Sequence, residues 1–137
     1  MRLLINSISL GNFHFEISLI LRDSMLINGI LANCDVWVSL TQKHIESLES
    51  ADISFWKKCL NSHSKTAKEL YYLETGTIEI KYIIAKRRLM YLHHILTRPD
   101  DELIYKVYNI QRISPSKGDF FCLLQSEREK YGIHFTD

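Results

Sequence analysis

Residues 86–103 read KRRLMYLHHILTRPDDEL and contain three adjacent cations, a histidine pair and two adjacent aspartates. Basic side chains beside carboxylates are the residue types of a metal-dependent phosphoryl-transfer site. In a polymerase, such a site holds its carboxylates on a rigid β-hairpin, so that two metal ions lie about 4 Å apart. Asp100 and Asp101 instead follow Pro99, where a helix is predicted to begin. We therefore expect them to cap that helix and not to hold a metal.

The other candidates for metal or nucleophile chemistry are equally incomplete. His93 and His94 are adjacent, so on a helix they point about 100° apart and cannot share one metal ion; we expect them to be buried or interfacial. Cys59 and His63 form half of a zinc site, without a second pair at the usual spacing. The sequence has no Gly-rich phosphate loop and no G-x-S-x-G motif. We expect no cofactor, metal or small-molecule substrate.

Positive charge is the stronger functional feature. Residues 57–98 contain nine Lys/Arg against three acidic residues, a balance of +6 in a chain of net charge +1, so the remainder carries −5. A basic face of this kind favours contact with a phosphate backbone. The predicted contact residues are Lys81, Lys86, Arg87, Arg88 and Arg98, with aliphatic stems packed and charged heads in solvent. The alternative is a solvated or acid-paired surface.

Four nearby tyrosines extend this hypothesis. Aromatic rings beside cations can stack on unpaired bases. Tyrosines at core spacing can equally be part of the hydrophobic core. The four are Tyr71, Tyr72, Tyr82 and Tyr91.

Composition indicates one globular domain over residues 1–137. The chain is 46% hydrophobic and 24% charged, and its two prolines and five glycines favour long helices. Its three widely spaced cysteines favour neither a disulfide framework nor a zinc knuckle, which indicates an intracellular location, cytoplasmic or nuclear, and not secretion. The longest apolar-rich stretch, residues 17–31, is interrupted by charge, so we expect no membrane span.

Periodicity predicts an all-α, irregular bundle-like fold of about five or six helices. Helices are expected over residues 14–31, 41–60, 66–75, 78–97, 100–110 and 119–131, with poor order at 1–14 and fraying at 125–137. The capping box Thr66-x-x-Glu69 begins the third helix, and Gly76 ends it. The fourth helix carries apolar residues on several flanks and should be largely surrounded by protein, although its first residues, IEIKYI, could form a strand. In the fifth, Leu103, Val107 and Ile110 should be buried.

The run from Thr66 to Gln111 resembles the region that follows the polymerase core in reverse transcriptases of non-LTR (LINE-type) retrotransposons. Its most specific part is ETG at 74–76 with RRLMYLHHIL-x-RP at 87–99. Upstream, ILANCDVW and SLTQKHIESLESADISFWKKCL are similar to the family's preceding helix, its Tyr-Gly-Ser-Glu-x-Trp segment and its next helix. Trp37 matches that segment and Asp35 stands in for the acid, but the Tyr-Gly-Ser part is missing. The resemblance covers Phe15 to Leu124.

This resemblance implies a thumb and post-thumb helical region, which grips the template–primer duplex and template RNA. The family's aromatic-x-Asp-Asp motif is not in the sequence, and neither are a zinc knuckle or a nuclease core. We therefore expect a non-catalytic remnant, a fragment without the palm, that contacts RNA or an RNA–DNA hybrid. The alternative is a helical interaction module or an inert fragment, self-associating through apolar surface at Leu19, Leu26, Phe120 or Phe121.

Overall fold

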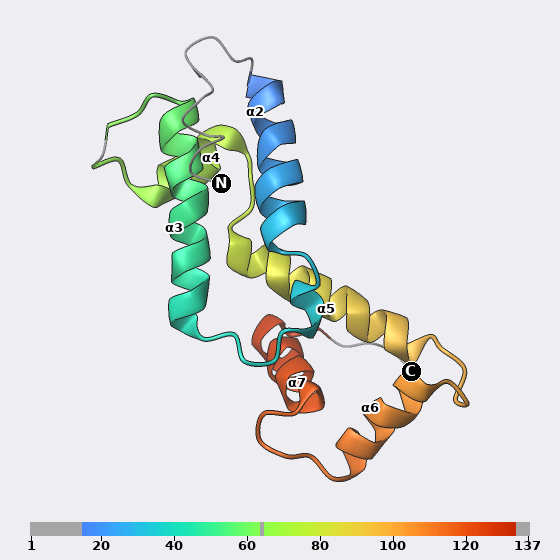
Figure 1. Cartoon of the computed structure of the whole chain (residues 1–137). Helices are drawn as coiled ribbons and strands as arrows, with labels where there is room; N and C mark the ends of the chain where they lie inside the picture. Colours follow the sequence, from blue (N-terminus) through green and yellow to red (C-terminus); the bar gives the residue numbers. More distant parts are fainter. Residues whose placement is uncertain (1–14, 64, 134–137) are drawn as a thin grey trace. The chain divides into compact units, whose positions relative to one another are not determined.

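The computed structural model describes residues 15–63 and 65–133, and over these ranges the protein is all-α (Figure 1). Neither range contains a strand, so residues 78–83 do not take up the alternative strand. The prediction of five or six helices is confirmed. The α-helices are α2 (Phe15–Leu21), α3 (Gln42–Cys59), α4 (Lys68–Thr75), α5 (Ile80–Leu96), α6 (Leu103–Ile113) and α7 (Phe120–Tyr131).

The helices group into two compact units, which we describe separately. The first unit contains the described residues up to Ala32 together with Gln42–Ile80, and the second contains Asn33–Thr41 together with the described residues from Lys81 onward. The single domain expected from the sequence stays a prediction, because two compact units can belong to one domain. None of the helices in the described ranges combines the length and apolarity that crossing a bilayer requires.

Glycines end two helices as the sequence predicts. Gly76 follows α4 with φ 65°, and Gly132 follows α7 with φ 62°. Both angles lie in the left-handed region, where a Cβ would be strained, so the chain leaves each helix at a glycine. Residues 125–131, for which fraying was expected, continue α7 as helix. The predicted poor order of 1–14 lies outside the described residues.

Both capping predictions at helix starts are wrong. The N-cap of α4 is Ala67, which has no side-chain acceptor, so Thr66 and Glu69 do not form the capping box. The N-cap of α6 is Glu102, one residue beyond the Asp100-Asp101 pair, and no side chain caps that helix. The two aspartates are exposed in the turn before it.

The first predicted helix changes its winding midway. After α2, residues Arg22–Ile30 continue as a π-helix, and a short 3-10 helix, Cys34–Val36, follows. Hydrophobic periodicity cannot distinguish these windings over so short a segment. Leu26 from the π-helix packs with Phe55, Trp56 and Tyr71 in the core of the first unit.

A buried ion pair lies beside that core. Arg22, 3% exposed, donates two hydrogen bonds to the carboxylate of Asp52, which is fully buried, at 2.7 and 2.8 Å. A third bond, of 3.0 Å, reaches the carbonyl of Ile78. Burial alone would lower the pKa of Arg22, but the hydrogen bond and charge of Asp52 outweigh it and raise that pKa. The pair therefore joins the π-helix to α3 and to the segment before α5.

The core of the second unit is built on Leu92, Ile95, Tyr108 and Leu124, from α5, α6 and α7. The prediction of which face of α6 is buried is wrong. Leu103, Val107 and Ile110 are 77%, 45% and 65% exposed, because Tyr108 and its neighbour Ile104 face the core instead. A helix with apolar residues on both sides has two possible inward faces, and the larger aromatic anchor occupies the core here.

Two further burial predictions are also wrong. Two apolar positions of α5 that were expected to face protein are exposed, Tyr82 by 44% and Met90 by 62%. The side chains proposed as exposed apolar surface are instead packed: Leu26 is buried, and Leu19, Phe120 and Phe121 are partly buried against the two cores.

We predict that Asp52→Asn destabilises the first unit by about 3–5 kcal/mol, because it leaves the guanidinium of Arg22 buried without a counter-charge. Urea unfolding followed by Trp56 fluorescence in a Trp37→Phe background measures this. The matched control, Glu102→Gln, removes the exposed partner of Arg98 and should change stability by less than about 1 kcal/mol. Equal effects of the two substitutions would contradict the structural role of the buried pair.

Candidate nucleic-acid interface

Lys81 and Lys86 are the predicted contact residues that the structure places best for a ligand. Both lie on α5 in the second unit, where Lys86 is exposed and Lys81 is half-buried. The ammonium group of Lys81 lies over the ring of Tyr82, 4.8 Å from its centroid. A cation held on an aromatic face keeps its charge at the surface while its stem packs.

Arg88 is not at the surface, and the expectation that its head is solvated is wrong. It is 3% exposed, donates to the carboxylate of Glu127 at 3.0 Å and donates to the carbonyl of Trp37 at 2.6 Å. Glu127 is itself mostly buried, with its side chain 15% exposed. Arg88 thus holds α7 and the Trp37 segment to α5, and its charge is already neutralised.

Arg87 and Arg98 also lie apart from Lys81 and Lys86. Arg87 is half-buried beside Cys34; burial raises the pKa of that thiol, and Arg87 only partly opposes the shift. Arg98 lies beyond the C-terminal end of α5, where it bonds His94 and, at 3.4 Å, Glu102. With a rise of 1.5 Å per residue, this is on the order of 20 Å from Lys81. The five predicted cations therefore do not form one continuous surface.

The histidine pair is exposed, so the prediction that it is buried is wrong, and an interfacial position stays a prediction. His94 lies beside Tyr91, with ring centroids 6.3 Å apart, and accepts from Arg98. His93 points elsewhere, toward a groove described next. No three His, Cys, Asp or Glu side chains among the described residues gather as metal ligands.

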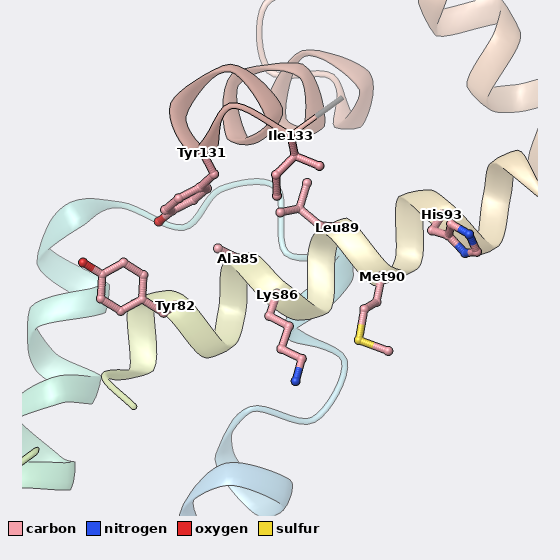
Figure 2. A pocket seen from close by; sticks show the side chains of 8 residues that line it. All are labelled: Tyr82, Ala85, Lys86, Leu89, Met90, His93, Tyr131 and Ile133. Carbon is pink, nitrogen blue, oxygen red and sulfur yellow. The ribbon is translucent and has the colours of Figure 1, made fainter. Parts of the chain in front are cut away.

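An apolar groove of about 440 Å³ runs along α5. Figure 2 shows Ala85 and Leu89 in the middle of it, with side chains reaching toward them from the end of α7 on one side. Lys86 and Met90 lie on the other side, and Tyr82 and His93 at the two ends. Its lining residues are Tyr82, Ala85, Lys86, Leu89, Met90, His93, Tyr131 and Ile133. None of these eight is acidic.

Sequence reasoning missed the part of the groove that α7 contributes. Tyr131 makes an edge contact with Tyr82, with ring centroids 6.2 Å apart, and Lys130 lies over the Tyr131 ring at 5.2 Å. Lys81 and Lys130 thus each lie over a tyrosine of the groove, and Lys86 is a further lysine in its lining. The pair Lys130-Tyr131 directly before Gly132 is a sequence signal, but it lies in the segment where only fraying was expected.

Of the four tyrosines considered as base-stacking residues, Tyr82 alone belongs to this groove and is exposed. Tyr71 is buried in the first core, and Tyr72 is half-buried. Tyr91 packs against Phe120, with ring centroids 5.7 Å apart.

Comparison of the chain with protein-family models, with curated proteins and with solved structures finds no match in any of the three.

We predict that Arg88→Met destabilises the second unit by about 3–5 kcal/mol, because it leaves Glu127 charged and largely buried. Amide hydrogen exchange of α7 should show the lost protection directly. The neighbouring substitution Lys86→Met, on the exposed side of the same helix, is the matched control and should leave that protection unchanged. If the two variants behaved alike, Arg88 would not hold α7 in place.

Proposed function

We propose that this chain is a non-catalytic, thumb-like remnant of a non-LTR retrotransposon reverse transcriptase that contacts RNA or an RNA–DNA hybrid. The proposal combines the family resemblance with one structural observation: Lys86 lines the groove, Lys81 and Lys130 lie over two tyrosines that also line it, and none of the eight lining residues is acidic. A local excess of positive charge beside a groove without acidic lining attracts an anionic polymer.

The proposed contact residues differ from the five cations predicted from the sequence. Lys81 and Lys86 remain, and Lys130 joins them. Arg88 is excluded because its guanidinium is engaged by Glu127. Arg98 is paired with Glu102, at the other end of α5, so it is at most a peripheral contact.

The proposed binding is electrostatic, so charge reversal at the lysines should weaken it. We predict that Lys81→Glu with Lys86→Glu lowers affinity for a blunt RNA–DNA hybrid by about tenfold or more, with the fold intact by circular dichroism. Fluorescence anisotropy of a labelled hybrid at low salt measures the change.

The control is Lys117→Glu, a charge reversal at an exposed loop residue, to be compared with Lys81→Glu and Lys86→Glu made singly. Lys117 precedes α7, whereas Tyr131 ends it, and twelve helical residues separate them by about 18 Å. An equal loss of affinity in the control, or no binding at micromolar protein, would contradict the proposed surface. Nucleotide incorporation by the chain with Mg²⁺ would overturn its non-catalytic assignment.

One observation favours the alternative, a helical interaction module. The outer face of α6 presents Leu103, Val107, Ile110 and Ile113, which are 45–80% exposed and spaced like the seam of a helix pair. The same apolar face of a second copy of this chain could pack against this stripe in a symmetric dimer. Sedimentation at high protein concentration tests this alternative: a dimer that Ile110→Glu dissociates supports it, and a clean monomer excludes self-association through this face.

A further inference from the structure

We propose that the groove along α5 takes an unpaired nucleobase, with the flanking lysines on the phosphates of the same strand. This inference rests on the proposed function and specifies its ligand as single-stranded nucleic acid, such as the overhang of a hybrid. It is carried by the groove's walls, its aromatic residues and its charge.

The side chains that line the groove favour a ligand with a flat apolar surface over a phosphate group. Ala85 and Leu89, at most 9% exposed, lie in its middle, and Met90 and Ile133 contribute further apolar side chains. A duplex presents phosphates and sugars, and these apolar side chains cannot donate hydrogen bonds to their oxygens. Burying phosphates and sugars without hydrogen-bond partners is costly. An unpaired base presents an aromatic face that can be buried without loss of hydrogen bonds.

The two tyrosines supply a stacking surface at one end. Tyr82 is 44% exposed although it lines the groove, so part of its ring is open to a ligand. The edge contact from Tyr131, with ring planes 64° apart, holds the Tyr82 ring in place. A base packed against a fixed tyrosine loses less side-chain entropy than one packed against a mobile ring.

The positive charge near the groove is complementary to the phosphates of a nucleic-acid strand. The ammonium groups of Lys81 and Lys130 lie over the rings of Tyr82 and Tyr131, at 4.8 and 5.2 Å from the ring centroids, and Lys86 lines the groove. Alternating cations and aromatic rings is the arrangement used to bind single strands without sequence preference. Because Lys86 and His93 are the main polar lining, we expect little discrimination among bases.

The test compares three hybrids of the same duplex: blunt, with a single-stranded overhang of about four nucleotides, and with an abasic overhang of equal length. The abasic overhang keeps the phosphates and removes the bases. We expect the overhang with bases to bind about tenfold more tightly than the abasic one, the effect of one stacked base. Tyr82→Ala should abolish this difference, and Tyr82→Phe, which keeps the ring, should retain it.

Methionine-methyl NMR locates the base. Of the three methionines, Met90 lies in the groove and Met25 in the first unit. We expect the overhang with bases to shift the Met90 methyl resonance, assigned with Met90→Leu, and to leave that of Met25 in place. Binding of all three hybrids with equal affinity and an unmoved Met90 overturns this inference and leaves the proposed function standing.

Failure of every hybrid to bind at micromolar protein overturns both proposals. The remaining alternative for an apolar groove with a lysine at its edge is an apolar carboxylate, for which decanoate is the probe. A Met90 shift with decanoate and with none of the hybrids would assign the groove to that chemistry and overturn the nucleobase proposal.

Discussion

The buried guanidinium of Arg88 is the contact on which the second unit depends. It is bonded to Glu127 of α7 and to the carbonyl of Trp37, so one side chain of α5 fixes two other segments. A buried cation without partners is strongly unfavourable, which makes the position of α7 a requirement of the fold. Because Tyr131 ends the same helix and Ile133 follows it directly, this contact also sets one wall of the groove.

The first unit also depends on a buried ion pair, formed by different residues. Arg22 and Asp52 form a bidentate pair inside an otherwise apolar contact between the π-helix and α3. Removal of either partner costs more than the pair contributes, so such pairs specify which faces meet. Burial and the negative charges of Asp52 and Glu49 also raise the pKa of the nearby Tyr72, so Arg22 is the counter-charge in an acidic surrounding.

Helix positions and their glycine ends were predictable, because periodicity and the left-handed requirement at Gly76 and Gly132 act locally. Burial was less predictable. The outer face of α6 has helical spacing but stays exposed, since the choice between two apolar faces depends on tertiary packing. The role of Arg88 was misassigned for the same reason: a helical wheel places it near Lys81, yet its partner Glu127 is 39 residues away in sequence.

One signal for the buried pairs was present in the sequence. Arg22 interrupts an apolar helix, and Asp52 falls on the apolar side of the next one, four residues before Trp56. Opposite charges on two facing apolar stripes are expected to pair, since neither can be buried alone. The groove had no comparable signal, because Lys130 and Tyr131 meet α5 only through tertiary structure.

The cations of α5 therefore fall into two groups, those that hold the fold together and those proposed to contact a ligand. Arg88 is committed to the fold, whereas Lys81, Lys86 and Lys130 are the proposed ligand contacts: Lys86 and Lys130 are exposed, and Lys81 and Lys130 lie over tyrosine rings. The same division explains why a basic stretch in the sequence does not become a uniformly basic surface.

The most direct test of the central claim is the salt dependence of hybrid binding by the unsubstituted chain, followed by fluorescence anisotropy. If three lysines neutralise phosphates, the logarithm of the association constant should fall against the logarithm of salt concentration with a slope of about −2 to −3. A slope near zero, or no binding at the lowest salt concentration, would contradict the claim that this surface binds a phosphate backbone.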